Sequence, residues 1–243
     1  MSDLQVKLGC DRFLALEWAD YAIELFLNTE PHTVKYALLK EFLHSEIPGD
    51  VSAEKTFYQL KRLWLNEGDE SQSLRVRAAE LLKRENTFEQ SIFHLGLAIN
   101  VFPVFKETCK RLGELSRVQE IINRKNVIDR VSQTFLYPSS IPRTVSRVIQ
   151  TLEDWKLVEV HKNEIRLQEM GIENVEVGSW VVHALLSSQR RAEMPLSSIN
   201  AVPEKLALRF VDLRQIVHQS DGFSIRYNAS GEEIVIIKIE QTA

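Results

Sequence analysis

The stretch Ser139–Val160 reads SSIPRTVSRVIQTLEDWKLVEV, and it decides the interpretation of the whole chain. Its apolar residues recur at helical spacing, so the part from Ile141 onward predicts an α-helix. A serine can cap the start of a helix, and Pro142 suits a first turn because the missing N–H of a proline needs no partner there. The following run LVEV favours a β-strand. The stretch therefore predicts a capped helix that leads directly into a strand.

The predicted helix has two different faces. At about 100° per residue, the aliphatic side chains fall together on one face, and they are Val145, Val148, Ile149 and Leu152. Polar side chains that can donate hydrogen bonds fall on the opposite face, and they are Arg143, Arg147 and Gln150, flanked by Thr144 and Ser146. The acidic Glu153 and Asp154 come late in the helix. We expect the aliphatic face to pack on its own domain and the polar face to meet a partner.

The neighbouring segments extend this pattern on both sides. SRVQEII is short and compatible with a strand, NRKNVIDRVSQTF predicts a helix, and residues 137–140 predict a turn. After the stretch, LVEVHKNEIRLQ alternates apolar and polar residues around HKNE, which predicts a β-hairpin. The order helix, strand, helix, turn, helix, hairpin is typical of a winged helix-turn-helix.

The whole chain divides into three modules, and its fold class is mainly α with small β-hairpins. Residues 1–95 carry helical periodicity in runs such as RFLALEWADYAIELFL and predict a helical module. Residues 96–170 predict the winged helix-turn-helix, with a helix interrupted or restarted at Pro103. Residues 171–243 predict a small α+β module or a second, degenerate winged helix, which ends in a hairpin that turns at Gly231.

Charge is distributed unevenly along a chain of ordinary soluble composition. Hydrophobic residues make up 44% and charged residues 26%, and the formal net charge is −4. Residues 101–170 hold twelve Lys/Arg against nine Asp/Glu, a net charge of +3, which leaves −7 for the remainder. A local positive region on an acidic protein fits a focused contact with phosphate.

Sequence patterns of enzymes, metal sites and membrane spans are missing from the chain. No GxxxxGK[ST], GxGxxG, GxSxG or HExxH pattern occurs, and Cys10 and Cys109 form no CxxC pair. A restriction-type nuclease site would need an acid two residues before Lys238, where Ile236 stands. No apolar run is long enough to span a bilayer, and the first residues do not form a signal peptide. We therefore expect no catalysis, no cofactor, no metal, no membrane and a cytoplasmic location.

Double-stranded DNA is the partner that the outward face of the predicted helix fits best. Arginine recognises guanine edges or phosphates and glutamine recognises adenine, so the base-reading candidates are Arg143, Thr144, Arg147 and Gln150. Candidates for contact with the DNA backbone lie at the preceding turn, on the second helix and at the tip of the hairpin; they are Ser139, Ser140, Arg124, Lys125, Lys162 and Asn163.

Two family resemblances support this interpretation. Residues 115–168 resemble the winged helix-turn-helix superfamily through IPRTVSRVIQTLEDWKLVEV, although Lys156 stands where that turn usually has glycine. The helical module with SAEKTFYQLKRLWL, followed by FHLGLAINVFPVFKETCKRL and the winged helix, resembles the DNA-binding accessory proteins of bacteriophage-exclusion (BREX-type) defence clusters. That resemblance implies a non-enzymatic component of an anti-phage system that binds double-stranded DNA, together with other subunits of a defence complex.

Two other functions remain open at the level of the sequence. The chain fits a scaffold subunit whose winged helices bind partner proteins, because the acidic remainder and the aromatic-rich helices offer docking surfaces. It also fits a transcription regulator that responds to a ligand, which would need a pocket that the sequence does not reveal.

Overall fold

The computed structural model describes residues 9–84, 89–135 and 139–238. Helices predominate and the sheets are small, which confirms the predicted class of a mainly α protein with small β elements. The first two residues of the predicted turn at 137–140 lie outside the described ranges.

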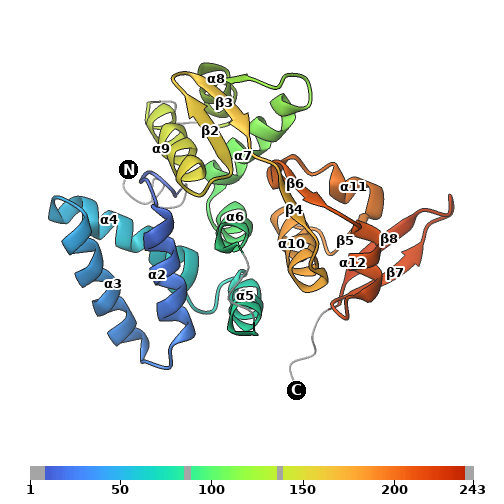
Figure 1. Cartoon of the computed structure of the whole chain (residues 1–243), viewed down its shortest axis with the longest axis horizontal. Coiled ribbons are helices and arrows are strands. Elements are labelled where there is room, and N and C mark those ends of the chain that lie inside the picture. The colour runs from blue at the N-terminus through green and yellow to red at the C-terminus, as the bar shows by residue number, and fades with distance from the viewer. Residues whose placement is uncertain (1–8, 85–88, 136–138, 239–243) are drawn as a thin grey trace.

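The N-terminal part is helical throughout its described residues. It consists of α2 (Leu16–Leu27), α3 (His32–Glu46), α4 (Asp50–Leu60), the π-helical turn η1 (Lys61–Leu65) and α5 (Gln72–Arg84). Figure 1 shows α2, α3 and α4 at one side of the molecule, with α5 nearer the centre. Trp64 and Phe57 are buried, as expected for aromatic residues at helical spacing.

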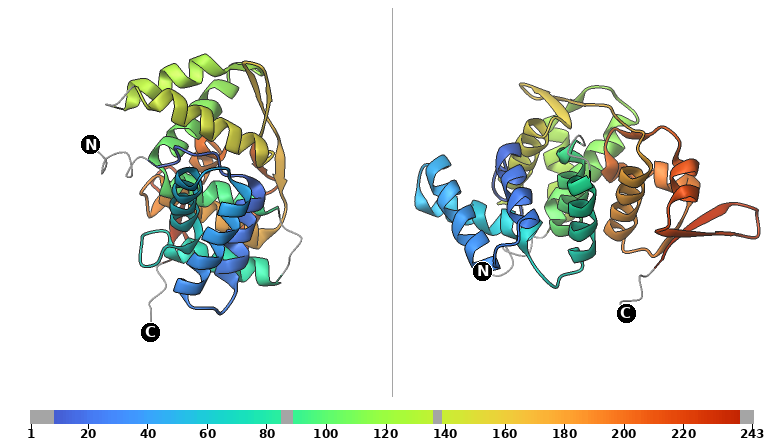
Figure 2. Two further views of the ribbon diagram at one scale, coloured as in Figure 1. Left: turned by 90° about the vertical axis from the view of Figure 1, so that its left-hand side faces the viewer. Right: turned by 60° about the horizontal axis from the view of Figure 1, so that its bottom comes forward.

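Helix α6 (Gln90–Val101) lies at the centre of the molecule, between the N-terminal helices and the C-terminal helix α10 (Val175–Ser188) (Figure 2). Nine consecutive residues of α6, from Ser91 to Ile99, are buried. A helix that is buried on every side serves as a core shared by its neighbours. The predicted boundary between residues 95 and 96 falls in the middle of this helix.

The break expected at Pro103 is confirmed. Helix α6 ends at Val101, and α7 (Pro103–Ser116) begins with the proline in its first turn. The next elements are β1 (Ile122–Asn123), α8 (Arg124–Thr134), α9 (Ile141–Asp154), β2 (Val158–His161) and β3 (Glu164–Leu167). The three strands form an antiparallel sheet in the order β1-β3-β2.

The C-terminal part is a mixture of helices and strands. After α10 come β5 (Glu193–Pro195), α11 (Leu196–Asn200), the 3₁₀ turn η2 (Pro203–Lys205), α12 (Leu213–Gln219), β7 (Phe223–Tyr227) and β8 (Glu233–Ile237). Their antiparallel sheet has the order β5-β8-β7, which repeats the order β1-β3-β2. The hairpin that was predicted around Gly231 is β7–β8, and Gly231 has a φ of 79°.

A parallel pair of short strands joins the last two parts of the chain. Strand β4 (Met170–Ile172) pairs with β6 (Leu208–Phe210), and the sequence analysis predicted neither strand. The predicted boundary between residues 170 and 171 falls inside β4. Strands of three residues are too short to show an alternating pattern.

We expect Gly113→Ala to destabilise the protein, because α7 lies against η2 at this glycine. A Cβ atom at Gly113 would lie 2.0 Å from the carbonyl oxygen of Pro203, and a backbone atom cannot rotate away. Overpacking of this kind costs about 1–3 kcal/mol. Thermal denaturation should show a lower Tm for Gly113→Ala.

Gly171→Ala is the matched control for this prediction. A Cβ at Gly171 meets nothing within 4 Å, so its Tm should stay close to that of the wild type. Equal melting curves for the two variants would contradict the close approach of α7 and η2.

Candidate nucleic-acid interface

Helix α9 has the two faces that the sequence predicts. Val145, Val148, Ile149 and Leu152 are fully buried against the rest of the protein. Arg143 and Gln150 are exposed on the opposite face, and Arg147 and Ser146 are partly exposed. The segregation arises because apolar residues recur every three or four positions, so their burial turns the polar residues outward.

The outward residues of α9 differ in whether they already bind another side chain of the protein. Arg147 donates from Nη1 to Oε1 of Gln150 at 2.7 Å, an i,i+3 contact on the helix surface. Arg143 has no ion pair within the described ranges. A ligand at Arg143 therefore displaces no partner among the described residues, whereas a ligand at Arg147 replaces the contact with Gln150.

Two predictions about the start of α9 are wrong. Thr144 is only 5% exposed, and its hydroxyl donates to the carbonyl oxygen of Ser140 at 3.1 Å, so it does not belong to the outward face. Ser140 precedes the helix, but its side chain makes no capping hydrogen bond. Ser139 is exposed and Ser140 is partly exposed, so both hydroxyls remain accessible beside the first turn of α9.

The N-terminal segment runs along one side of α9. The backbone N–H of Leu14 donates to Oγ1 of Thr151 at 3.0 Å, and that of Leu16 donates to Oδ2 of Asp154 at 2.6 Å. Phe13 lines a shallow hollow with Arg147 and Gln150. Arg143 and Gln150 therefore stay exposed, while the N-terminal segment covers the side of α9 on which Thr144 and Thr151 lie. No local pattern in the sequence indicated this contact.

The tip of the β2–β3 hairpin lies beside the start of α8. His161 pairs with Glu164, so the turn consists of Lys162 and Asn163 alone, and Lys162 has a φ of 55°. The backbone N–H of Arg124 donates to the carbonyl oxygen of Asn163 at 2.8 Å. This bond brings the hairpin tip next to the first residues of α8.

The cations of this region lie around the same surface. Arg124 donates from Nη2 to the carbonyl oxygen of Ser146 on α9 at 3.3 Å, which places its guanidinium between α8 and α9. Lys125, Lys162 and Asn163 are exposed, and neither lysine forms an ion pair in the described part of the chain. The structure thus brings the hairpin tip, the start of α8 and the middle of α9 together.

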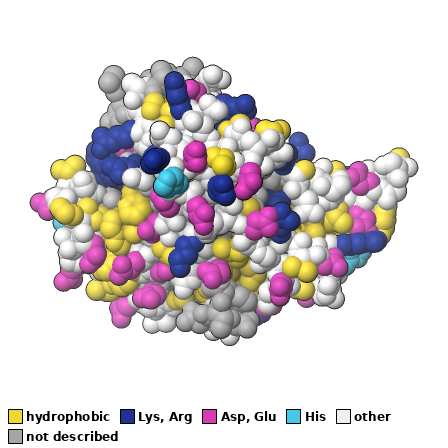
Figure 3. Space-filling model, turned by 45° about the horizontal axis from the view of Figure 1, so that its top comes forward, with side chains coloured by type: hydrophobic (Ala, Val, Ile, Leu, Met, Phe, Trp, Pro, Cys, Tyr) yellow, Lys and Arg dark blue, Asp and Glu magenta, His cyan; other side chains and the backbone are white. Residues whose placement is uncertain are grey.

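Positive and negative side chains are unevenly distributed over the surface. In Figure 3, dark-blue Lys and Arg side chains gather on the upper half, whereas the lower left carries mostly magenta Asp and Glu. Acidic side chains also interrupt the blue area. This face therefore carries a limited positive region rather than a continuous basic surface, which fits a focused contact with phosphates.

A hollow of about 360 Å³ lies between the start of α9 and the N-terminal helices. Its lining includes three basic side chains, Arg12, Lys55 and Arg143, and one acidic side chain, Asp11. Ser139 and Ser140 line it as well. Sequence analysis did not place Arg12 or Lys55 in the site, because both belong to segments far from α9 in the chain.

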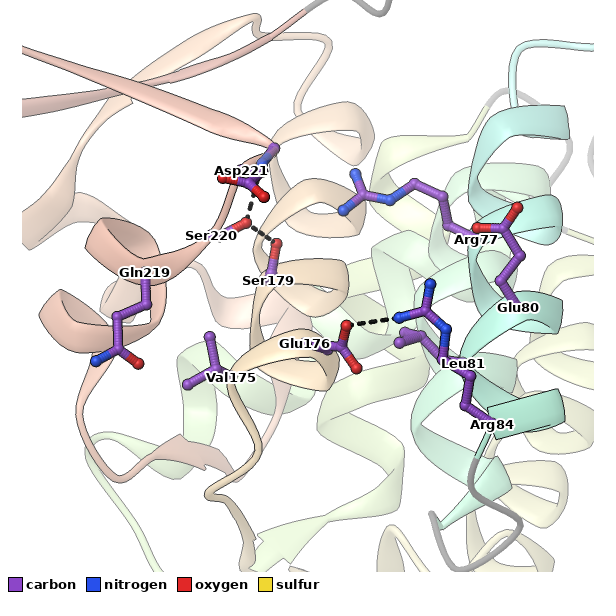
Figure 4. A pocket seen from close by; sticks show the side chains of 11 residues that line it. Arg77, Glu80, Leu81, Arg84, Val175, Glu176, Ser179, Gln219, Ser220 and Asp221 are labelled. Carbon is purple, nitrogen blue, oxygen red and sulfur yellow. Dashed lines mark hydrogen bonds and ion pairs between the residues drawn. The ribbon is translucent and has the colours of Figure 1, made fainter.

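A second hollow, of about 220 Å³, lies between α5, the start of α10 and the loop after α12 (Figure 4). Its basic residues Arg77 and Arg84 are matched by three acidic ones, Glu80, Glu176 and Asp221. Arg84 pairs with Glu176 at 2.8 Å, as the dashed line shows. This hollow has no excess of positive charge and does not favour an anion.

Arg77 of this second hollow also makes a pH-sensitive contact. Its guanidinium donates from Nη1 to Nδ1 of His183 at 2.8 Å, and His183 must accept because a guanidinium can only donate. Burial, with the nearby positive charge of Arg77, lowers the pKa of His183 to about 4. The folded protein therefore holds this imidazole neutral.

Acid should destabilise the protein through His183. An unfolded histidine titrates near pH 6.5, so between about pH 6.5 and pH 4 the unfolded chain binds the proton that folded His183 excludes. The free energy of unfolding then falls as the pH falls, by at most about 1.4 kcal/mol per pH unit from this group. His183→Gln keeps an acceptor for Arg77 and should reduce the slope, measured by urea denaturation at several pH values.

His161→Gln, which removes an exposed histidine at the hairpin tip, is the control for this experiment. The pH dependence of its free energy of unfolding should match that of the wild type. A His183→Gln profile as steep as that of the wild type would contradict the assignment of a buried neutral imidazole.

The described residues offer no metal site and no helix that could cross a bilayer. No three His, Cys, Asp or Glu side chains in the described ranges converge on a point that could hold a metal ion. None of the helices in those ranges is both long and apolar enough to span a membrane. Cys10 and Cys109 are free and buried, and burial raises the pKa of each thiol.

Comparisons with protein-family models, with curated proteins and with solved structures each found no match. The assignment of function therefore depends on the geometry and charge of the surface around α9.

Proposed function

We propose that the elements from α7 to β3 form a winged helix-turn-helix through which the protein binds double-stranded DNA without catalysing a reaction. The observation that carries the proposal is the outward face of α9, where Arg143, Arg147 and Gln150 lie opposite a fully buried aliphatic face. A helix of this kind can pack on its domain and still offer side-chain donors to the major groove.

The order of elements supports the proposal. A helix, a short strand, two helices and a hairpin follow one another from α7 to β3, and the first strand joins the hairpin in the order β1-β3-β2. This arrangement suits a helix-turn-helix in which α9 is the recognition helix and β2–β3 is the wing.

The contacts then divide by role. Arg143, Arg147 and Gln150 would read base edges, and Thr144 has no part in this set because it is buried. The residues around them would bind the phosphate backbone and fix the register, and they are Ser139, Ser140, Arg124, Lys125, Lys162 and Asn163. Glu153 and Asp154 are exposed at the far end of α9, away from the end that enters a groove.

A role in anti-phage defence extends this proposal. The support is the resemblance of the helical module and the following winged helix to accessory proteins of bacteriophage-exclusion clusters. In that setting the protein would be a cytoplasmic, DNA-binding subunit beside other members of a defence complex.

The alternative function is that of a scaffold subunit, and the C-terminal module favours it. Helix α12 occupies the position in its module that α9 occupies in the other, but its outward Arg214 pairs with Glu233 on β8 at 2.7 Å. His218 and Tyr227 also contact that carboxylate, each at 3.2 Å. The outward arginine of α12 is therefore exposed but already paired with its own hairpin, and this face suits a protein partner better than DNA.

We expect Arg143→Ala combined with Arg147→Ala to remove most of the affinity for duplex DNA. Each arginine that contacts a base contributes about 1–3 kcal/mol, so the double variant should bind at least about 30-fold more weakly. Neither side chain belongs to the core, so the Tm should be unchanged. Fluorescence anisotropy with a labelled duplex at low salt measures the affinity.

Lys83→Ala combined with Arg191→Ala is the matched control, because it removes two exposed cations that lie away from α9 and form no ion pair in the described ranges. This control should bind like the wild type. If the α9 variant also binds like the wild type, α9 is not the interface. If the wild type binds no duplex but co-purifies with a partner protein, the scaffold function replaces the proposal.

A further inference from the structure

The hollow at the start of α9 has the composition of an anion site. Its three basic residues come from three separate parts of the chain: Arg12 from the N-terminal segment, Lys55 from α4 and Arg143 from α9. Cations gather in this way only at a cost in mutual repulsion, unless a negative charge offsets it. The other charges around the hollow therefore decide whether the cations are already neutralised.

The described residues around the hollow do not neutralise this cluster. Asp11 is the single acidic residue among the described residues of the lining, and its carboxylate already accepts a hydrogen bond from the side-chain amide of Gln59. Lys55 and Arg143 form no ion pair within the described ranges. The lining therefore has an excess of two positive charges.

Arg12 provides an independent sign of a missing partner. Its Nε atom is buried and has no hydrogen-bond partner among the described residues, and its Nη1 makes only a long contact of 3.4 Å to the carbonyl oxygen of Asp11. A buried donor without a partner is costly, and a ligand oxygen in the hollow would provide that partner.

The backbone holds Arg12 in place. Gly9 and Cys10 both have left-handed φ angles, 66° and 61°, and the side chain of Cys10 is fully buried. On the other side, Leu14 is fixed to Thr151 of α9 by its N–H. The backbone of Arg12 is therefore anchored on both sides, and its side chain lines the hollow.

The start of α9 adds to the same field. The side chain of Ser140 makes no capping hydrogen bond to the first N–H groups of this 14-residue helix. Ser139 and Ser140 both line the hollow. Uncapped N–H groups at a helix start favour negative charge. Hydroxyls, amides and cations thus converge on one space.

We propose that this hollow binds a backbone phosphate of the duplex whose groove α9 enters, so that Arg12 and Lys55 extend the DNA interface onto the N-terminal module. This inference rests on the proposed function. Arg143 lies at the border of the hollow and of the outward face of α9, so one DNA strand can reach both. None of the described residues that line the hollow has an aromatic side chain to stack on a base, which favours a phosphodiester over a free nucleotide.

The salt dependence of duplex binding tests this inference. The slope of log K against log salt is negative, and each lost phosphate contact reduces its magnitude by about 0.9. Because the hollow holds one phosphate, Arg12→Gln with Lys55→Gln should reduce the magnitude of the slope by about 1 and weaken binding to all duplex sequences alike. Lys55→Gln alone, a change at an exposed residue, should also reduce the magnitude of the slope and serves if the double variant folds poorly.

Lys83→Gln with Arg191→Gln is the matched control and should leave the slope unchanged. If the wild type binds duplex and the Arg12 and Lys55 variants keep its slope, this inference fails and the proposed function stands. If the wild type binds no duplex at all, the proposed function fails and this inference fails with it.

Chemical labelling of lysine distinguishes a duplex phosphate from free phosphate. An amine-reactive reagent and mass spectrometry should show that duplex DNA protects Lys55 but not Lys83, and that inorganic phosphate at equal ionic strength protects neither. Protection of Lys55 by inorganic phosphate to the same degree would overturn the assignment to DNA, and so would equal labelling of Lys55 with and without duplex.

Discussion

The two hydrogen bonds of the His94 imidazole are the constraint on which the arrangement of this protein depends. Trp64 donates from its indole Nε1 to Nδ1 at 2.9 Å, so Nε2 carries the proton and donates to Asp20 at 2.8 Å. Burial lowers the pKa of His94, and the neutral ring is tolerated inside because both nitrogens have partners. Helices α2 and α6 and the turn η1 therefore meet at one fixed point.

The same region of α6 also positions the other two parts of the chain. Trp155, which follows α9, packs against the ring of His94 with centroids 5.1 Å apart. Phe93, one residue earlier, packs against Trp180 of α10 at 4.9 Å, and Trp180 donates to the carbonyl oxygen of Leu74 in α5. One helix thus fixes α9 and the N-terminal segment relative to each other. For this reason the surface around α9 includes residues from the N-terminal part of the chain as well as from α9. Residues 96–170 by themselves would lack Arg12 and Lys55.

Local patterns in the sequence predicted the parts of the fold that local physics controls. The buried face of α9, the helix break at Pro103 and the β-hairpin around HKNE follow from spacing and residue type alone. Thr144 was predicted on the outward face but is buried. Helical spacing predicts the centre of a buried face, whereas the burial of residues at the edge of that face depends on which other segments pack beside the helix. Arg12 and the β4–β6 pair were missed because their partners lie far away in the chain. The fold was thus more predictable than the site.

The two strand–helix modules indicate why the same order of elements can serve different partners. Helix α9 has 14 residues and keeps Arg143 without a carboxylate partner in the described ranges, whereas α12 has seven residues and its Arg214 is paired with Glu233. A phosphate contact needs unpaired cations, because an arginine that already binds a carboxylate must first lose that bond. Lys156, which adopts a φ of 58° where glycine is usual, adds a further exposed cation just after α9. On the proposed function, DNA therefore binds the first module, and the second module remains available for a protein partner.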